Sequence, residues 1–332
     1  MKKITYIIVF LVAGIFSATA QIDPHLSQYY IYPSWLNPAL TGAFDGDFRI
    51  SGVYRNQWNN IADGFSTAGL SADMVTSKNL NFGVGVMQQT SGTGYRYLTA
   101  NASASYSGLK FDAEGYKRLV FGIQAGVISR KFDSSKFQFG DQWNSAVGYD
   151  PTTGSLDGFQ DLSSSMLDIG AGAVYYDADP GKKANVFLGF SASHLTRPED
   201  SFTSGSSKQK LPIRYTLHGG VKLNLSGFIS IVPNALYLRQ GNAEEKMVGG
   251  YVEMNGPANT DILLGANYRF QDAIVPFAGL NIKNLVIGVS YDVNNSDLRK
   301  YISNANSMEV SLSYIIRRSK TLGEKHFICP RL

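Results

Sequence analysis

From Phe48 onwards the chain alternates apolar residues with small or polar ones at a period of two. In one segment, for example, Ile287 and Val289 alternate with Gly288 and Ser290. This period is typical of a β-strand with one apolar face, whereas an amphipathic helix repeats every three to four residues. The alternation is clearest in four segments: Pro212–Asn224, Thr260–Phe270, Leu285–Asn294 and Ser307–Arg317. These segments predict a β-rich protein.

Fainter versions of the pattern bring the number of predicted strands to fourteen. They occupy Phe48–Trp58, Phe65–Val75, Leu80–Gln89, Tyr95–Gly108, Leu119–Arg130, Leu167–Tyr176, Ala184–Leu195, Phe228–Gln240, Lys246–Asn255 and Ala273–Lys283. Each segment is close to the roughly 9–11 residues of a tilted transmembrane strand, and bacterial single-chain barrels have an even number of strands. We therefore predict an all-β fold, a transmembrane outer-membrane β-barrel of fourteen antiparallel strands over residues 48–317. A soluble periplasmic β-sandwich is the alternative, but its inner faces rarely carry so much Gly, Ser and Asn.

The lengths of the connections between the predicted strands give the barrel a direction. The three long gaps, Lys131–Met166, Thr196–Leu211 and Asn295–Asn306, follow strands five, seven and thirteen. All three therefore lie at one end of the barrel. Outer-membrane barrels have short periplasmic turns and longer outer loops, so we expect these gaps to face the cell exterior.

The N-terminus has the features of a secretory signal peptide, which we assign to residues 1–20. Lys2 and Lys3 precede an apolar run, and Ala18-Thr19-Ala20 offers small residues for cleavage before Gln21. An uncleaved anchor is the alternative, but the run is short for a membrane span. Loss of the two lysines would lower the net charge from +4 to +2, which gives no electrostatic case for nucleic acid as a partner.

Overall composition excludes several further classes of protein. Charged residues make up 17% of the 332 residues, below the roughly 25% of soluble domains, and Gly contributes 34. Mean hydropathy is −0.11, which argues against a multi-span helical protein. With one cysteine, neither an intramolecular disulfide nor a cysteine-based zinc cluster can form. We expect no cofactor and no metal.

Two segments flank the predicted barrel. Residues 21–47 contain prolines, which forbid a regular helix or central strand, and many aromatic residues, which do not suit a solvated linker. We expect this segment to plug the lumen or to pack under the periplasmic mouth. Residues 318–332 form a short tail beyond the last strand. By the parity of the strands both segments are periplasmic, which suggests a platform for partners.

Three motifs near the N-terminus resemble a known family. They are Asp23-Pro24-His25-Leu26-Ser27-Gln28-Tyr29, Tyr32-Pro33-Ser34-Trp35-Leu36-Asn37-Pro38-Ala39-Leu40-Thr41-Gly42 and Tyr54-Arg55-Asn56-Gln57-Trp58. Together they resemble the opening of PorP/SprF proteins, outer-membrane proteins of the type IX secretion and gliding machinery of Bacteroidota. The closing Cys329-Pro330-Arg331-Leu332 is similar to the family's usual ending, although members often end in an aromatic residue.

The resemblance implies a non-enzymatic role in secretion. Its implied partners are a periplasmic ring or translocon of the type IX system and a secreted cargo, such as an adhesin, with a C-terminal sorting domain. Outer-membrane lipid would surround the barrel. The candidate residues for plug and partner contacts are Asp23, Pro24, Gln28, Tyr29, Trp35, Asn37, Pro38, Arg55, Gln57, Trp58, Cys329, Pro330 and Arg331. In particular, we expect lumen-facing Arg55 to hold residues 21–47 through backbone carbonyls or Asp23.

Other chemistry is weakly indicated. Gly83-Val84-Gly85 and Gly170-Ala171-Gly172 lie within predicted strands, where glycine marks bends or tight packing rather than a phosphate loop. A barrel hydrolase would need Ser191 or Ser193 beside a histidine, and Ser is abundant throughout. Aspartates near the first long gap match no calcium-loop spacing. The remaining functional alternative is a passive or ligand-gated uptake barrel, similar to fatty-acid transporters in strand number and N-terminal plug.

Overall fold

The computed structural model describes most of the chain from residue 23 onwards. The described ranges are 23–58, 64–76, 78–133, 136–150, 152–155, 163–200, 209–257, 260–300 and 305–317. Within these ranges no helix is long and apolar enough to cross a membrane. The predicted signal peptide and the tail of residues 318–332 lie outside the described residues.

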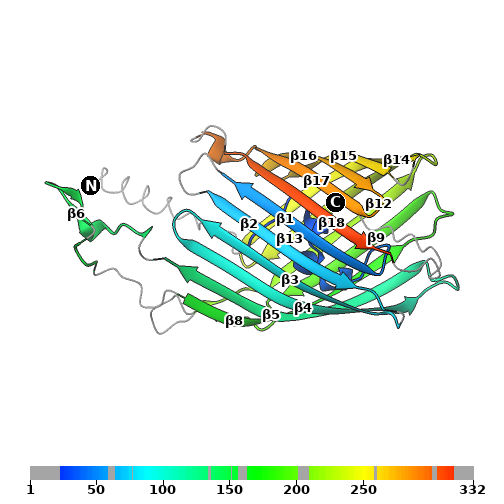
Figure 1. The fold of residues 1–332 in the computed structure, drawn as a ribbon, viewed down its shortest axis with the longest axis horizontal. Coiled ribbons are helices and arrows are strands. Elements are labelled where there is room, and N and C mark those ends of the chain that lie inside the picture. Colours follow the sequence, from blue (N-terminus) through cyan, green and yellow to red (C-terminus); the bar gives the residue numbers. More distant parts are fainter. Residues whose placement is uncertain are drawn as a thin grey trace, which may run out of the picture.

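Fourteen antiparallel strands close into one barrel, as predicted (Figure 1). They are β1 (Phe48–Gln57), β2 (Phe65–Met74), β3 (Leu80–Ser91), β4 (Tyr95–Lys110), β5 (Lys117–Phe132), β8 (Ser163–Asp177), β9 (Ala184–Ser193), β12 (Arg214–Asn224), β13 (Ile229–Gln240), β14 (Ala243–Gly256), β15 (Thr260–Arg269), β16 (Ala273–Ile282), β17 (Leu285–Asn294) and β18 (Ser307–Ile316). β1 pairs with β18 along its whole length and so closes the barrel. Closure leaves no open sheet edge, which a bilayer would penalise because lipid offers unpaired backbone groups no partner.

The alternation in the sequence corresponds to the two faces of the wall. In β17, Val289 and Tyr291 are exposed on the outside, whereas Ser290 and Asp292 are buried on the lumen side. The exposed side chains of the other strands are likewise mainly Leu, Ile, Val, Phe and Tyr. The outer face is therefore an apolar belt for lipid. The lumen face combines buried polar side chains with apolar ones, such as Met87, Val120 and Phe187, that form one core cluster with residues of the N-terminal segment.

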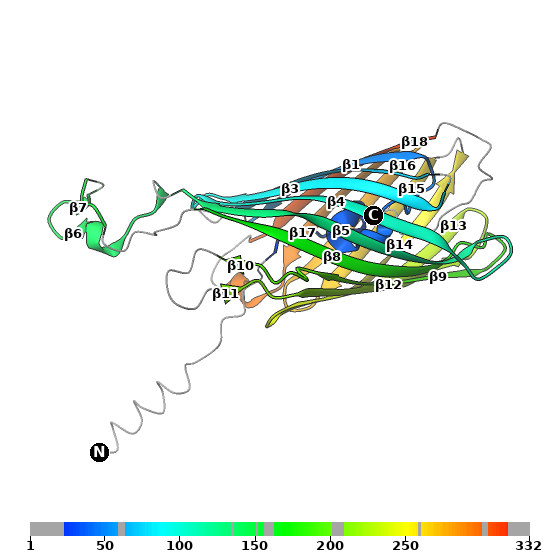
Figure 2. The same ribbon diagram turned by 90° about the horizontal axis from the view of Figure 1, so that it is seen from below.

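All three long connections leave the same end of the barrel, which we call the long-loop end. The connection from β5 to β8 carries η4 (Gly140–Gln142) and a small sheet of β6 (Trp143–Asn144) and β7 (Gly148–Tyr149), which projects well beyond the barrel (Figures 1 and 2). The connection from β9 to β12 contains a second small sheet of β10 (Glu199–Asp200) and β11 (Gln209–Lys210). η6 (Asp297–Lys300) lies between β17 and β18. The opposite, short-turn end has connections such as residues 283–284.

Residues 23–42, which we call the lumen segment, lie inside the barrel. They contain three short elements: η1 (Tyr29–Ile31), α2 (Pro33–Leu36) and η2 (Pro38–Leu40). The segment begins at the long-loop end, where Asp23 contacts His194 just after β9. It finishes at the short-turn end, where the Gly42 amide donates to Asp73 near the end of β2. The start of the segment is therefore at the mouth opposite to the periplasmic platform that we expected, because the chain crosses the lumen before β1 begins.

Candidate functional site

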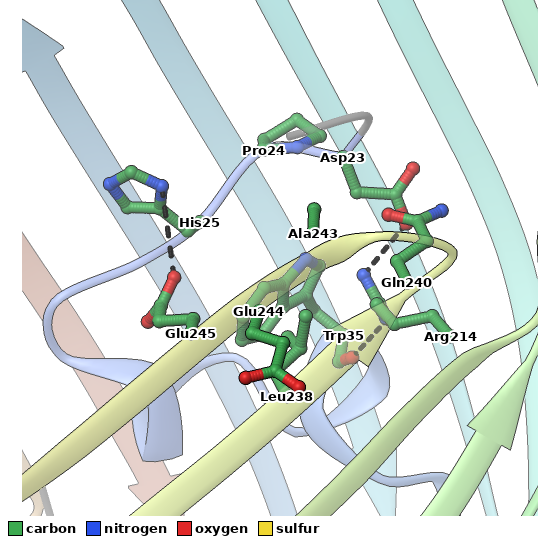
Figure 3. Close-up of a pocket in the computed structure, with 10 residues that line it drawn as sticks. All are labelled: Asp23, Pro24, His25, Trp35, Arg214, Leu238, Gln240, Ala243, Glu244 and Glu245. Atoms are coloured by element: carbon green, nitrogen blue, oxygen red, sulfur yellow. Dashed lines mark hydrogen bonds and ion pairs between the residues drawn. The ribbon is translucent and has the colours of Figure 1, made fainter. Parts of the chain in front are cut away.

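The first anchor of the lumen segment is Asp23 at the long-loop mouth. Its carboxylate lies 2.6 Å from His194 Nε2 and accepts from Arg214 Nη1 at 3.0 Å. Arg214, at the start of β12, also donates to the Trp35 carbonyl at 2.7 Å and lies over the Trp35 ring, 4.9 Å from its centre (Figure 3). One arginine of the wall thus holds two points of the segment that are twelve residues apart in sequence.

The charges around Asp23 stabilise one another. Burial by itself would lower the pKa of His194, because it disfavours the charged imidazolium. The Asp23 carboxylate and a second contact, with Asp168, outweigh this effect and raise the pKa of His194 to about 9. Burial would raise the pKa of Asp23, yet His194 and Arg214 hold it well below its usual range. Near neutral pH the Asp23 carboxylate therefore lies between the imidazolium of His194 and the guanidinium of Arg214. Hydrogen bonds between charged groups of this kind are strong.

The second anchor is a carboxylate of β18 that binds the backbone of the lumen segment. Glu309, which is completely buried, accepts from the amides of Ser27 and Gln28 at 2.8 and 2.7 Å. The Gln28 side chain donates to Ser290 Oγ, and its oxygen accepts from Ser311 Oγ at 2.6 Å. The backbone amides of Ser27 and Gln28 are buried and form no strand or helix hydrogen bonds, but the Glu309 carboxylate accepts from both. The segment therefore avoids the cost of burying unpaired donors.

Arg55 of β1 lies at the centre of this second anchor. It donates to Ser27 Oγ at 2.7 Å and to His25 Nε2 at 3.0 Å, and it pairs with Asp292 at 2.8 Å and Glu309 at 3.3 Å. Because an arginine can only donate, His25 Nε2 is the acceptor of this bond and carries no proton. Arg55 therefore contacts the lumen segment, but through Ser27 and His25, whereas Arg214 is the arginine that binds Asp23.

The third anchor is Asn37, which is fully buried against β8, β9 and β12. Its side-chain amide donates to the carbonyls of Ala173 and Phe190, each at 3.2 Å, and lies 3.2 Å from His218 Nε2. Its oxygen accepts from the Ala39 amide at 2.9 Å, which begins η2. The Asn-Pro pair of the sequence motif thus turns the chain and attaches it to the wall.

Glycines on the wall make room for this turn. Gly122 of β5 and Gly172 of β8 are register partners, and both face the lumen segment. A side chain on Gly122 would meet the backbone of Pro38 and Ala39 at 2.3 Å, and one on Gly172 would meet Asn37. Gly83 and Gly85 of β3 likewise lie against Thr41 and Tyr32. The two glycine motifs of the sequence therefore belong to close packing within the barrel.

The remaining sequence-predicted residues are distributed as follows. Tyr29 donates to Asn234 at 2.8 Å, and Pro24 lines a small pocket together with Asp23 and Trp35 (Figure 3). Gln57 and Trp58 line a second small pocket at the same mouth, beside Arg55. The Trp58 ring packs edge-on against Phe65 at 6.0 Å. Cys329, Pro330 and Arg331 lie outside the described residues.

Sequence reasoning did not identify the wall residues that receive the segment. Arg214, His194 and Glu309 are the most important of these, and each is buried. The alternation placed Arg214 and Glu309 on the polar faces of predicted strands. A charged residue on a lumen face was the only signal in the sequence that could have indicated a contact with the segment. Which charge meets which part of the segment depends on strands that are far apart in sequence.

The two serines considered as candidate nucleophiles contact the lumen segment or its anchor. Ser191 donates to the Leu36 carbonyl and Ser193 accepts from Arg214, so both candidate nucleophiles take part in holding the lumen segment. Among the described residues, no group of three or more His, Cys, Asp or Glu could hold a metal ion. The arrangement can fix a polypeptide inside a barrel.

Comparisons with known proteins agree with this architecture. The family model described as "Type IX secretion system membrane protein PorP/SprF" matches residues 18–314. No curated protein matches the chain. Among solved structures, a deletion mutant of the monoaromatic hydrocarbon channel TodX has a TM-score of 0.50 at 12% identity, covering 84% of this chain and 92% of that one. The Ralstonia pickettii toluene transporter TbuX has a TM-score of 0.49 at 11% identity, covering 85% and 92%. At 12% identity the likeness to the TodX mutant concerns the barrel fold alone.

Proposed function

The chain belongs to the PorP/SprF family of type IX secretion system membrane proteins, and we propose that it is a non-enzymatic outer-membrane component of the type IX secretion and gliding machinery. In this role it helps to translocate or anchor a secreted protein, such as an adhesin with a C-terminal sorting domain. Its periplasmic side, including residues 318–332, contacts the periplasmic ring or translocon.

The observation that carries the proposal is the family match over residues 18–314. The occupied lumen then indicates where a secreted protein would bind. Tyr29, Trp35 and Leu36 are buried inside the barrel, and three anchors join the lumen segment to strands from β1 round to β18. While the segment is docked, a polypeptide would have to displace it to pass through. We therefore place cargo binding on the long loops and the outer rim.

The sheet of β6 and β7 is the part of the long-loop end best suited to a protein partner. It projects beyond the barrel, and its Trp143 side chain is 58% exposed while Val147 in the turn is 74% exposed (Figure 1). Tyr149 lies beside Trp143, with ring centres 6.0 Å apart. Exposed aromatic residues supply a large share of the binding energy at protein interfaces.

The uptake alternative needs a continuous path for a substrate across the lumen. The lumen segment stands in that path, and the two pockets at the mouth each have a cavity volume of only about 10 Å³. Small-molecule sites have volumes of roughly 300–1,000 Å³. The transporters among the similar structures do not support the uptake alternative further, because they resemble this chain only in fold.

The test is a mild-detergent pull-down from native outer membranes, with the co-purifying chains identified by mass spectrometry. An affinity tag after Gly227 would sit in a short turn with open space around it. We expect a large secreted protein or secretion-ring subunits to be recovered. A solitary barrel under several detergents would refute the proposal and favour uptake.

Two variants separate the two kinds of partner. Trp143→Ala should reduce recovery of the cargo, whereas Phe228→Ala, at an even more exposed aromatic position of the opposite end, should not. Deletion of residues 318–332 should abolish recovery of ring subunits while the protein remains a heat-modifiable barrel. An uptake barrel would be unaffected by either change.

A further inference from the structure

Two basic side chains face outward at the long-loop end of the wall. Arg96 of β4 and Lys131 of β5 are direct register partners, and both are exposed. Their sequence neighbours Tyr97 and Arg130 form the adjacent register pair, where the guanidinium lies over the buried tyrosine ring at 5.7 Å on the lumen side. Because successive residues of a strand point to opposite faces, Arg96 and Lys131 point towards the surrounding membrane.

Neither of these two side chains forms an ion pair or a side-chain hydrogen bond with another residue in the described part of the chain. The nearest acidic residue along the sequence, Asp133, follows the end of β5. Like charges directly opposite one another on a sheet are destabilising. An anion placed between them would remove this repulsion.

The height of the pair corresponds to the headgroup layer of the membrane. Below it, the outward positions of the same strands are Leu98 and Val127, which belong to the apolar belt, and Ser129 and Ser165 lie between the belt and Lys131. Arg96 is two residues beyond Leu98, which at about 3.3 Å per residue and a tilt of about 40° is about 5 Å. The headgroup layer of a bilayer is about 5–7 Å thick on each side.

The opposite side of the barrel provides a contrast at a similar height. There Lys246 of β14 also follows the apolar belt, two residues beyond exposed Val248. Its ammonium, however, is 2.7 Å from the Glu244 carboxylate, and Glu244 is also the register partner of Arg239. The basic residues of that side are thus neutralised within the protein, and Arg96 and Lys131 are not.

We propose that Arg96 and Lys131 form a binding site for the phosphate group of a phosphorylated glycolipid in the outer leaflet. The guanidinium fork of Arg96 and the ammonium of Lys131 bind the phosphate oxygens. The Ser165 hydroxyl donates to the Ser129 hydroxyl at 3.4 Å, and this pair lies beside the site for further hydrogen bonds. The acyl chains lie along the exposed Val127, Leu167 and Ile169 side chains. The charged pair and the apolar strip together distinguish a lipid from a free anion.

The test measures binding of diphosphoryl lipid A to the full-length barrel in a neutral detergent, by native mass spectrometry. The informative variant is Lys131→Glu, which places an acid opposite Arg96. It converts a repulsive register pair into an attractive one, so folding should not suffer, while the phosphate meets a carboxylate. Lys246→Gln is the matched control, because it removes an exposed lysine of the same height.

We expect Lys131→Glu to weaken lipid A binding at least tenfold and Lys246→Gln to leave it within twofold of the wild type. Millimolar inorganic phosphate should not displace the lipid. Three results would overturn the proposal: equal binding by Lys131→Glu, an equal loss in Lys246→Gln, or displacement by inorganic phosphate, which would indicate a free-anion site.

Discussion

At the long-loop end of the lumen, each buried charge is paired with opposite charges or hydrogen-bond donors. These partners come from both the barrel wall and the lumen segment. Asp23 of the segment meets His194 and Arg214 of the wall, and Glu309 of the wall meets two amides of the segment. A buried ion without such partners would cost several kcal/mol. Each group therefore depends on the docked segment, and changes to single residues should affect docking and barrel stability together.

Arg55→Ala is the most direct test of this dependence. The substitution leaves Asp292 and Glu309 without one cation and removes the contacts to Ser27 and His25. Breaking a buried pair of this kind typically costs about 3–5 kcal/mol. We expect a lower temperature for the heat-modifiable mobility shift and greater permeability of cells to detergent. Arg239→Ala, at an exposed arginine of β13, is the control; if both variants behave alike, the role given to Arg55 is wrong.

The Asp23 anchor should respond to pH in a defined direction. The folded pKa of His194, about 9, exceeds its ordinary value of 6.5, so its contribution is complete below about pH 6.5 and is lost as the pH rises through about 9. The pKa of Asp23 is lowered from 3.8, so its contribution is present above that pH and is lost on further acidification. The start of the lumen segment should thus be held most firmly between about pH 4 and 6.5.

Thiol labelling can measure this effect. A Pro24→Cys variant, combined with Cys329→Ser, places a single thiol at a buried position beside Asp23. We expect a membrane-impermeant maleimide to label it more slowly at pH 7 than it labels the same protein with His194→Gln. The ratio of the two rates cancels the titration of the thiol itself and should approach one above pH 9. A ratio that stays constant from pH 7 to 10 contradicts the assignment.

At the scale of elements, the lumen segment is ordered by its surroundings. Its helical elements have three or four residues, far below the roughly 12–15 residues that an isolated helix needs. Pro33 and Pro38 favour the first turn of α2 and η2 because proline lacks only a donor that is unused there. The wall supplies the remaining stability through the three anchors and through glycines that permit close approach.

Filling one of these glycine positions should displace the segment. In Gly122→Val the new side chain would overlap the backbone at Pro38 and Ala39, and overpacking typically costs about 1–3 kcal/mol. We expect the variant to insert as a barrel and to show ion conductance in planar bilayers that the wild type lacks. Gly140→Val, at a loop glycine with open space around it, should remain closed. Closed channels in both variants would mean that the segment can absorb the change.

At the scale of the whole molecule, the two ends of the barrel differ in kind. The long-loop end carries the projecting sheet of β6 and β7 and the first residues of the lumen segment, whereas the other end has short turns (Figure 2). The fold and the family match indicate that the barrel spans one outer membrane, with its two ends in the aqueous phases on either side. The long loops should face the cell exterior and the short turns the periplasm.

Two glycines with open space around them allow this orientation to be tested with matched tags. Gly154 lies in the long connection between β5 and β8, and Gly227 lies in the short turn between β12 and β13. A tag after Gly154 should be detected by antibody on intact cells, and a tag after Gly227 only after the outer membrane is permeabilised. The reverse pattern would invert the barrel and move the lipid site to the inner leaflet.

The alternation of single residues was enough to predict the fold. All fourteen segments became strands of one barrel, with ends shifted by a few residues, such as β8 starting at Ser163 rather than Leu167. This succeeded because a strand in a barrel wall has only two environments, lipid and lumen, and its side chains report them at a period of two. The family motifs near the N-terminus were visible in the same way, as local sequence.

The path of the lumen segment and its partners were decided only by the tertiary structure. Asn37 lies against His218, 181 residues away, and Gln28 against Glu309, 281 residues away. Parity placed the start of β1 at the short-turn end but could not reveal that the preceding residues begin at the opposite mouth. The closure of fourteen strands brings these side chains into one lumen. The alternation within a single strand does not indicate which other strand will face it across that lumen.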